Sequence, residues 1–329
     1  MKIALLGAGA WGTALAIAFA GRHEVTLWSR EDDVAVDLVN TRENHRFFPG
    51  HRLPDSVRVE TDFAAAVAAA QLLVVATPIA GLRPTAERLK QAGCTAPLLW
   101  VCKGFEAGSG KLPHQVIAEV LGPQAVCGAF SGPSFAEEVA AGQPTAVTLA
   151  SRDHRFAVET ARQLHTRRLR VYANDDLIGV EVGGAVKNVM AIATGVCDGL
   201  GLGLNSRAAL MTRGLAEIAR LGVALGAHRD TFMGLAGMGD LILTCTGDLS
   251  RNRRVGLALA ANKALPDILK ELGHVAEGVY TAREVERLAA ELKVDMPISL
   301  AIAAVLDGRV SASEELELLM AREPKEEAA

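Results

Sequence analysis

The chain has 329 residues, of which 50% are hydrophobic and 22% charged, and its formal net charge at pH 7 is −4. This length is enough for about two domains with buried cores, and the negative net charge offers no general attraction to nucleic acid or anionic membranes. The five cysteines form neither a CxxC pair nor a Cys/His metal spacing. We therefore expect reduced thiols, no metal site and, because no signal peptide precedes the first predicted strand, a cytoplasmic protein.

The apolar run Lys2–Leu6 leads directly into the sequence GAGAWG, in which Gly7, Gly9 and Gly12 precede a helical stretch. In dinucleotide-binding folds the first glycine permits a tight turn, the second lets a pyrophosphate approach the backbone, and the third lets the helix pack closely on the strand. The pyrophosphate then lies on unpaired N–H groups at the helix N-terminus. The order of strand, turn and helix predicts a dinucleotide site here; a purely structural glycine turn is the alternative.

The second predicted strand, Glu24–Trp28, ends at Ser29 and Arg30, where an NAD-specific site usually has an acidic residue for the ribose diol. A hydroxyl and a guanidinium can instead bind a 2′-phosphate through charge-assisted hydrogen bonds. The sequence therefore favours NADP(H) over NAD(H). The alternative is that Arg30 is a solvated loop residue whose neighbour is Glu31 or Asp32.

Apolar segments alternate with amphipathic ones as far as Tyr172, and several are apolar throughout, as in strands covered on both faces. This predicts the fold class α/β: a Rossmann-type, mostly parallel sheet with helices on both faces. The uncharged stretch Phe63–Leu82 is not expected to span a membrane, because it divides into a helix ending at Ala70 and a strand. The further strands are predicted at Leu72–Ala76, Leu98–Cys102, Val126–Ala129, Ala146–Leu149 and Leu169–Tyr172.

After about Asn174 the strand signals fade, and the rest of the chain is predicted to be helical. We expect a dinucleotide-binding domain at 1–175 and an all-α substrate and catalytic domain at 176–329. Glycine-rich breaks between helices are expected near 199–205, 234–239, 247–248 and 273–278, and a frayed tail at 321–329.

Lys187 lies in a predicted helix, Leu177 to about Gly195, on a face of apolar and small residues that includes Gly183 and Gly184. Paired glycines destabilise a helix, which indicates that another element or a ligand approaches the backbone beside the lysine. One interpretation keeps the ammonium in water above an apolar stem. The other desolvates it, which lowers its pKa toward neutrality and lets it exchange a proton with a substrate oxygen.

Two segments follow predicted strands at the edge of the sheet where ligands bind in open α/β folds. Lys103 comes after the strand Leu98–Cys102 and could reach a substrate there, or be a solvated strand-end lysine. The segment Ser131–Ser134, which includes Gly132, leads into a helix that begins near Phe135. Its hydroxyls and amides could contact a ligand or cap the helix.

Asp240 begins an apolar helix in which Thr244 lies one turn further on. Asp240 could be a plain N-cap. Four-residue spacing also places the two side chains on one face, where together they could orient a lysine ammonium.

The sequence SRNRR begins at Ser250 and opens a helix that runs to about Ala261. Ser250 can cap this helix, while its N–H groups, its dipole and Arg251 make an anion site that would fit a phosphate. A basic, solvated helix start is the alternative.

Together these segments resemble bacterial NAD(P)-dependent glycerol-3-phosphate dehydrogenase over nearly the whole chain. The resemblance implies reversible reduction of dihydroxyacetone phosphate to sn-glycerol 3-phosphate by NAD(P)H, a reaction that supplies glycerophospholipid synthesis. The matching segments are GAGAWGTALA, CKGFE, SGPSFAEEVAAGQPTAV, VEVGGAVKNV, RGLAEIARLG, GLAGMGDLILTC, SRNRRVG and AEGV.

The resemblance also implies roles for single residues. Lys187 corresponds to the proton donor and acceptor, with Asp240 and Thr244 orienting it and Lys103 stabilising the developing alkoxide. Substrate contacts fall on Lys103, Gly132, Ser134, Lys187, Asp240, Ser250, Arg251 and Asn252. Cofactor contacts, beside the three glycines, fall on Trp11, Arg30, Lys103, Ala136, Arg251, Val275 and Glu277. The loop at 46–53 varies in the family and receives no assignment.

Two other functions compete with this one. A β-hydroxyacid dehydrogenase would also combine a dinucleotide domain, a helical domain and a lysine, but it would bind a carboxylate, whereas the SRNRR and CKG segments favour a small phosphorylated substrate. A redox sensor that binds NADP without turnover leaves Lys187 and its acidic partner unexplained. The sequence contains no coiled-coil heptad and is compatible with a homodimer.

Overall fold

The computed structural model describes residues 1–273 and 276–321. Its main sheet has eight strands in the order β10-β9-β8-β7-β6-β1-β2-β5, and all neighbouring pairs are parallel except β8 and β9. This confirms the predicted Rossmann-type, mostly parallel sheet. The strands are β1 (Lys2–Leu6), β2 (Glu24–Trp28), β5 (Arg58–Glu60), β6 (Leu72–Val75), β7 (Leu98–Trp100), β8 (Cys127–Ser131), β9 (Thr145–Ala150) and β10 (Leu169–Asn174).

Helices cover both faces of this sheet, which explains why its strands are apolar throughout. In β1, Ile3 and Leu5 belong to one hydrophobic core, while Ala4 and Leu6 belong to another on the opposite face. The first core is closed by α1 (Ala10–Phe19), α2 (Asp32–Thr41) and α7 (His154–Leu164), and the second by α3 (Phe63–Val67), α4 (Leu82–Gln91) and α5 (Pro113–Leu121). The short η1 (Ile79–Gly81) and α6 (Ala136–Ala140) lie in loops after strands.

Three strands were not predicted. They are the edge strand β5 and a separate antiparallel hairpin of β3 (Glu43–Asn44) and β4 (Phe48–Arg52). All three are short and mostly polar, and they carry no apolar run that would reveal them. The predicted strand at Leu98–Cys102 ends at Trp100, so Lys103 stands in the loop beyond it.

The second half of the chain is helical and is built around α8 (Leu177–Gly199), which packs against its neighbours on several sides. Among the described residues, α8 is the one helix long and apolar enough to cross a bilayer, but 94% of that apolar window is buried inside the protein. The surrounding elements are α9 (Gly203–Ala224), η2 (Arg229–Met233), η3 (Leu235–Gly239), α10 (Asp240–Thr246), α11 (Arg251–Ala260), α12 (Leu265–Leu272), α13 (Glu277–Leu292), α14 (Pro297–Leu306) and α15 (Ala312–Met320).

Two of the expected helix boundaries were wrong. The helix of Lys187 does not end near Gly195: a Cβ there would overlap the carbonyl oxygen of Arg253, so this glycine lets α11 cross α8 closely. The break expected at 234–239 is confined to Gly234, which is extended, because Leu235–Gly239 is a π-helical turn that continues into α10. The break expected at 199–205 is confined to 200–202, and the predicted tail lies, from residue 322 on, outside the described residues.

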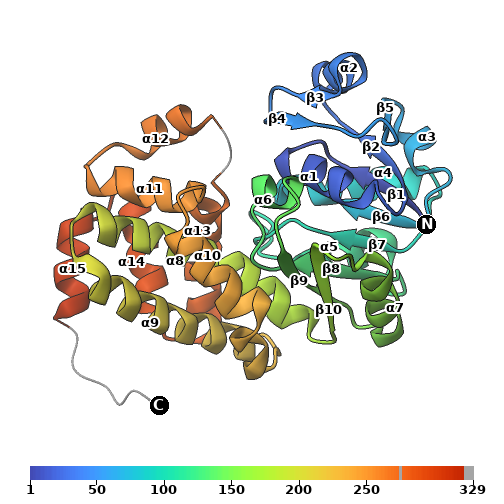
Figure 1. Cartoon of the computed structure of the whole chain (residues 1–329). Helices are drawn as coiled ribbons and strands as arrows, with labels where there is room; N and C mark the ends of the chain where they lie inside the picture. The colour runs from blue at the N-terminus through green and yellow to red at the C-terminus, as the bar shows by residue number, and fades with distance from the viewer. Residues whose placement is uncertain (274–275, 322–329) are drawn as a thin grey trace.

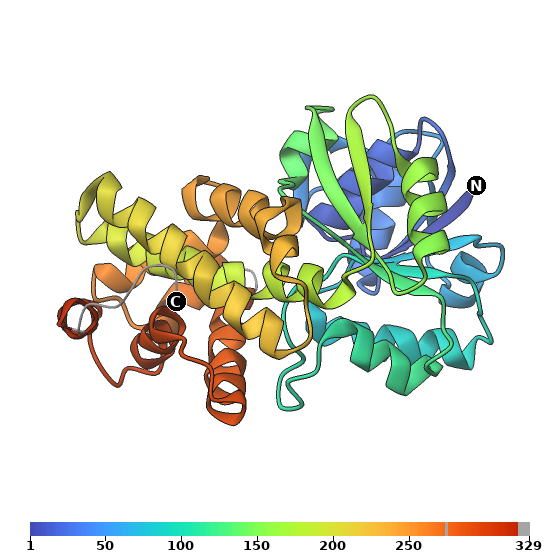
Figure 2. The same ribbon diagram turned by 90° about the horizontal axis from the view of Figure 1, so that it is seen from below.

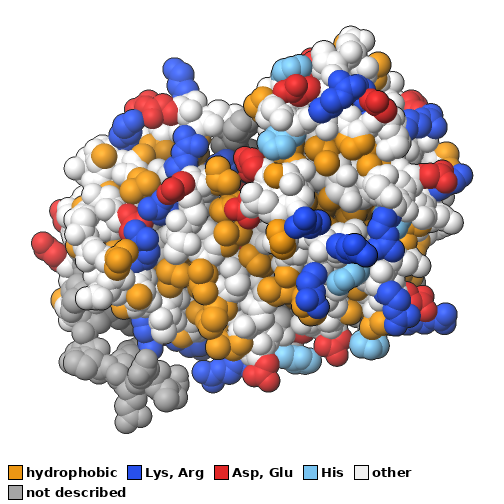
Figure 3. All heavy atoms as spheres, in the orientation of Figure 1, with side chains coloured by type: hydrophobic (Ala, Val, Ile, Leu, Met, Phe, Trp, Pro, Cys, Tyr) orange, Lys and Arg blue, Asp and Glu red, His pale blue; other side chains and the backbone are white. Residues whose placement is uncertain are grey.

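The sheet part and the helical part lie side by side, with α8 running from one into the other (Figures 1 and 2). The space-filling view shows a notch between them, on the side of α12 and of the β3–β4 hairpin (Figure 3). The carboxyl ends of β6, β7 and β8 lead into segments that meet the helical part, so side chains from both parts can share one site.

Candidate functional site

Lys187 is buried at the junction of the two parts. Its ammonium donates to Oδ1 of Asp240 and, at 2.8 Å, to the hydroxyl of Thr244, and its side chain is only 7% exposed. An ammonium held in water above an apolar stem is therefore excluded. The one-turn spacing of Asp240 and Thr244 on α10 places both acceptors on the same lysine.

The second oxygen of the Asp240 carboxylate binds Lys103, which comes from the sheet part. The distance from Lys103 Nζ to Asp240 Oδ2 is 2.6 Å, and the same ammonium lies 3.4 Å from the carbonyl oxygen of Gly132. Asp240 is 1% exposed and is the first residue of α10, whose N-cap is Gly239, and its carboxylate binds the two lysines, so the interpretation as a plain N-cap was wrong. One carboxylate thus holds two ammonium groups together.

Burial changes the acidity of Lys187. The pKa of this lysine is lowered to about 8, mainly by desolvation and also by the positive charge of Lys103, against the opposing effect of the Asp240 carboxylate. A lysine with a pKa near 8 can both give and take a proton close to neutral pH.

The glycine pair on α8 makes room for other groups beside Lys187, as the sequence predicted. A Cβ on Gly183 would lie 2.6 Å from the carbonyl oxygen of Ala236 in η3. A Cβ on Gly184 would lie 3.0 Å from Ser131 Oγ and 3.5 Å from the side chain of Lys103. The approaching elements are η3 and the strand-end segments of the sheet, and both bring site residues to Lys187.

The N-terminus of α11 lies on the helical side of the same region. Ser250 caps it by accepting from the backbone N–H of Arg253 at 3.2 Å. Arg251 is exposed and has no ion-pair partner among the residues described, whereas Arg253 is paired with Asp198 and Asp248. Free helix N–H groups and a free guanidinium are the features that an anion site needs.

Asn252 is held by two residues that the sequence did not single out. Its amide donates to Asn188 Oδ1 at 3.0 Å and accepts from the backbone N–H of Gly278 at 3.0 Å. Asn188 follows Lys187 directly and is 5% exposed. A polar side chain on an otherwise apolar helix was the signal that could have revealed it.

Glu277 connects the groups of the site electrostatically. Burial raises the pKa of its carboxyl, against the opposing effects of Arg251, Lys103, Lys187 and the backbone N–H of Ile79. Glu277, at the start of α13, therefore lies within the electrostatic influence of the three cations of the site. The neighbouring Val275 lies outside the described residues.

The loop after β8 places Gly132 and Ser134 next to Lys103. The Ser134 hydroxyl donates to the carbonyl oxygen of Gly132 at 3.2 Å, and the N-cap of α6 is Phe135 without a side-chain cap, so Ser134 does not cap this helix. Ala136 begins α6, which packs against α1 beside the glycine turn (Figure 1).

The glycine turn between β1 and α1 has one open position. Gly7 has φ +119°, and a Cβ on Gly12 would overlap the Gly7 carbonyl oxygen, so the fold itself requires both glycines. A Cβ on Gly9, in contrast, meets nothing within 4 Å. This space lies at the N-terminus of α1, where backbone N–H groups have no helical partner and a pyrophosphate fits. Trp11 in the first turn of α1 is half-buried.

The end of β2 carries an acid as well as a cation. The side chain of Arg30 is 74% exposed and lies 2.7 Å from Glu31 Oε1, while Ser29 Oγ lies 3.3 Å from Glu31 Oε2. Glu31 thus binds both groups that the sequence assigned to a 2′-phosphate. This is the pairing named in the alternative interpretation of Arg30.

A glycine turn on a Rossmann-type sheet, together with a buried lysine bound by an aspartate of a helical second part, is typical of a nicotinamide-dependent dehydrogenase. Two family models match the chain: the N-terminal part of NAD-dependent glycerol-3-phosphate dehydrogenase over residues 2–157 and its C-terminal part over 176–317. The chain belongs to the NAD-dependent glycerol-3-phosphate dehydrogenase family. The resemblance stated from the sequence is confirmed.

Individual relatives agree with this assignment. The chain is 80% identical over 329 residues to glycerol-3-phosphate dehydrogenase (NAD(P)+) of Dechloromonas aromatica strain RCB, with 100% of both chains covered. It is 60% identical to the enzyme of the same name from Aromatoleum aromaticum, covering 99% of this chain and 100% of the relative. The crystal structure of glycerol-3-phosphate dehydrogenase from Coxiella burnetii superposes with a TM-score of 0.93 at 40% identity, covering 98% of this chain and 99% of that one.

Proposed function

We propose that this chain reduces dihydroxyacetone phosphate to sn-glycerol 3-phosphate with NAD(P)H, reversibly, and so supplies glycerophospholipid synthesis. The observation that carries the proposal is the pair of lysines on Asp240, one of them buried, next to a helix N-terminus with a free arginine. Its family membership and the names of its relatives support the same reaction.

Lys187 is the proposed proton donor. When bound, NAD(P)H supplies a hydride to the C2 carbonyl carbon of the substrate. Lys187 gives its proton to the carbonyl oxygen, and Asp240 and Thr244 hold the ammonium in the orientation that this transfer needs. Lys103 stabilises the negative charge that develops on the same oxygen. In the reverse direction neutral Lys187 takes the proton from the alcohol.

The N-terminus of α11 is the proposed phosphate site. Arg251 binds the phosphate directly, and Ser250, Asn252 and the free N–H groups of the helix complete the site. Gly132 and Ser134, at the end of β8, contact the substrate from the side of the sheet. This arrangement favours a phosphate over the carboxylate of a β-hydroxyacid.

The cofactor is proposed to lie on the turn formed by Gly7, Gly9 and Gly12. Trp11, Ala136, Glu277 and, outside the described residues, Val275 complete its contacts, while Arg251 and Lys103 serve both ligands. Ser29 and Arg30 favour NADPH over NADH once Glu31 releases them to a 2′-phosphate.

The sequence supports three broader proposals about the protein. We propose that the dinucleotide-binding domain at 1–175 and the helical domain at 176–329 meet at the start of α8. We also propose that the protein is cytoplasmic and that its small-molecule partner is a phosphorylated ketone.

The direct test is to mix the protein with NADPH and dihydroxyacetone phosphate and to follow the absorbance of the reduced cofactor. We expect rapid oxidation with this substrate and little with unphosphorylated dihydroxyacetone. Faster turnover of a 3-oxo carboxylate would favour a β-hydroxyacid dehydrogenase. Tight NADPH binding without turnover of any of these compounds would favour a redox sensor.

A further inference from the structure

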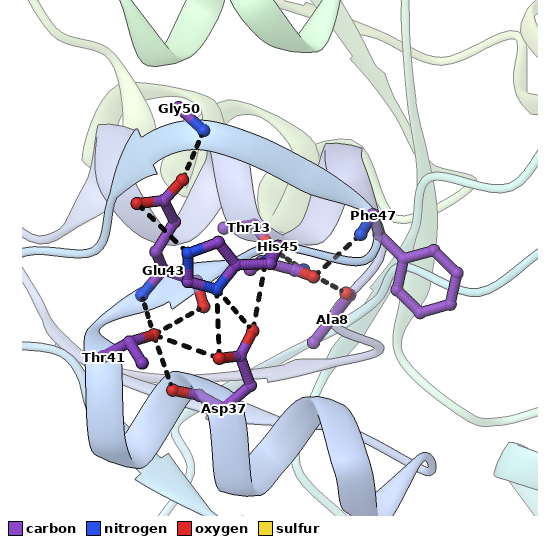
Figure 4. Close-up of polar contacts among 9 residues, drawn as sticks. Ala8, Thr13, Asp37, Thr41, Glu43, His45, Phe47 and Gly50 are labelled. Carbon is purple, nitrogen blue, oxygen red and sulfur yellow. Dashed lines mark hydrogen bonds and ion pairs between the residues drawn. The ribbon is translucent and has the colours of Figure 1, made fainter.

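The side chain of Asn44, in β3, connects the β3–β4 hairpin to the glycine turn. Figure 4 shows its partners Ala8, Thr13 and Phe47 close together. Asn44 is 0% exposed. Its amide nitrogen donates to the carbonyl oxygen of Ala8 at 2.7 Å and to the hydroxyl of Thr13 at 3.0 Å. Its amide oxygen accepts from the backbone N–H of Phe47 at 3.0 Å. Two acceptors on one side and a backbone donor on the other determine which way the amide faces.

The hydrogen-bond partners of Asn44 belong to the turn on which the cofactor is proposed to lie. Ala8 lies between Gly7 and Gly9 in the turn, and Thr13 lies in the first turn of α1, where its N–H bonds to the Gly9 carbonyl at 2.9 Å. Asn44 therefore fixes the peptide next to the open position at Gly9 and the helix turn that follows it. A hydrogen bond to a buried carbonyl is costly to lose, because no water can replace it.

Other contacts of the hairpin lie on its exposed side. His45 Nδ1 lies 2.9 Å from Asp37 on α2, and Glu43 accepts from the backbone N–H of Gly50 at 2.5 Å (Figure 4). The His45 side chain is 55% exposed. These contacts attach the hairpin to α2 and close its own loop, and they do not reach the glycine turn. Asn44 is the inner attachment and His45 the outer one.

We infer that Asn44 is a positioning residue for the cofactor: it holds the Ala8 peptide and the start of α1 so that their N–H groups face the pyrophosphate. This inference rests on the proposed cofactor site at Gly7, Gly9 and Gly12. N–H groups that already point at the site do not have to be reoriented when the anion binds, so this free-energy cost is not subtracted from the affinity. Loss of Asn44 lets the turn relax and weakens cofactor binding, while the chemistry at Lys187 stays as it is.

The test compares four variants of the full chain. Asn44→Leu keeps the approximate shape and removes all three hydrogen bonds of the amide. Because only the bonds to Ala8 and Thr13 reach the glycine turn, we expect the Kd and KM for NADPH to rise about 10-fold. The kcat and the KM for dihydroxyacetone phosphate, at saturating NADPH, stay within about twofold of the parent because Asn44 touches neither lysine. His45→Ala is the matched control on the same hairpin and leaves the Kd unchanged. Thr13→Val leaves the hydrogen bond between Asn44 and Ala8 intact, so it raises the Kd for NADPH far less than Asn44→Leu does.

Gly9→Val separates failure of this inference from failure of the cofactor site itself. A Cβ at Gly9 meets no protein atom within 4 Å, and the backbone of Gly9 is extended, with φ −73° and ψ −179°. We therefore expect the fold to tolerate valine there, while the side chain fills the space proposed for the pyrophosphate. If Gly9→Val abolishes NADPH binding and Asn44→Leu leaves the Kd unchanged, only the role of Asn44 is wrong. If Gly9→Val leaves NADPH binding intact, the cofactor does not lie on this turn, and both proposals fail.

Two further results would overturn the role of Asn44. Equal increases in Kd for Asn44→Leu and His45→Ala would show that any displacement of the hairpin matters. A loss of kcat or of thermal stability without a change in the NADPH constants would show a structural role alone. Should Asn44→Leu not fold, Asn44→Asp gives the same comparison, because its carboxylate still accepts from Phe47 but repels the Ala8 carbonyl.

Discussion

The two ends of the proposed substrate site hold their charges in different ways. At the proton-transfer end, Lys187 and Lys103 are both paired with Asp240, and neither lysine side chain is more than 18% exposed. At the phosphate end, Arg251 is exposed and has no ion-pair partner within the described part of the chain. The groups proposed to perform the chemistry are therefore oriented by the protein itself, while the group proposed to recognise the substrate is free to bind the ligand.

Solvation explains this difference. A buried ammonium without a partner is strongly destabilising, so Lys187 can be desolvated only because Asp240 accompanies it. Two protonated lysines on one carboxylate leave one positive charge in excess, which in the proposed mechanism lies next to the oxygen that becomes negative during reduction. An exposed arginine is solvated by water and needs no protein partner, so Arg251 stays available for the phosphate.

The largest effect is expected from Lys187→Met, which removes the proton donor and retains the apolar stem. We expect kcat to fall about 10³-fold or more, in the range of a lost general acid. The melting temperature should change little, because Asp240 keeps Lys103 as its partner. Steady-state kinetics and thermal unfolding check the two parts of this prediction, and Lys90→Met, at a surface lysine, is the control. Full turnover in a folded Lys187→Met variant would refute the proposed mechanism.

Arg251→Ala tests the opposite end. We expect kcat/KM for dihydroxyacetone phosphate to fall about 10²-fold, since one charge-assisted contact in a catalytic site contributes about 3 kcal/mol. The slow reduction of unphosphorylated dihydroxyacetone should not change, so the variant discriminates less between the two ketones. Arg254→Ala, an exposed arginine further along α11, is the control. A variant that still prefers the phosphorylated ketone by the parental factor would place the phosphate elsewhere.

The same comparison shows which features the sequence could reveal. The strand, glycine turn and α1 are contiguous, so local pattern was sufficient for the dinucleotide-binding half. Lys187 was conspicuous because Gly183 and Gly184 are unfavourable in a helix unless something approaches them. In both cases the signal and the structural reason lie within a few residues of each other.

The sharing of Asp240 by two lysines could not be predicted in this way. Lys103 and Asp240 are 137 positions apart and meet only because the two parts of the chain fold against each other. The glycines before Asp240 also led to the prediction of a helix break. In the structure, Gly237 lies in a helical turn, where the lack of a side chain lets it pack against the backbone of Phe232. Asn44 was not singled out for a related reason: the strands of its hairpin are short and have no apolar periodicity.

The pH dependence of turnover tests the buried end of the site, where the proposed proton donor has a shifted pKa. The pKa of Lys187 is lowered to about 8 by desolvation. A lysine is protonated below its pKa, so kcat/KM for reduction should fall about tenfold per pH unit above pH 8, where the donor is lost. The oxidation of glycerol 3-phosphate needs the neutral amine and should fall below pH 8. The residual activity of Lys187→Met should lack both of these changes, and a profile that persists in this variant would assign the titration to another group.

The smallest effect is expected at Arg30, an exposed arginine that, unlike Arg251, already has a partner. Arg30→Ala should lower the ratio of kcat/KM for NADPH to that for NADH by about tenfold, as expected for one exposed charge-assisted contact. Glu31→Gln should raise this ratio, because Glu31 competes with a 2′-phosphate for Arg30 and Ser29. Arg52→Ala, on the neighbouring hairpin, is the control. If neither substitution changes the ratio, Arg30 is a solvated loop residue. Of the two exposed arginines proposed to bind a phosphate of a ligand, only Arg251 would then do so.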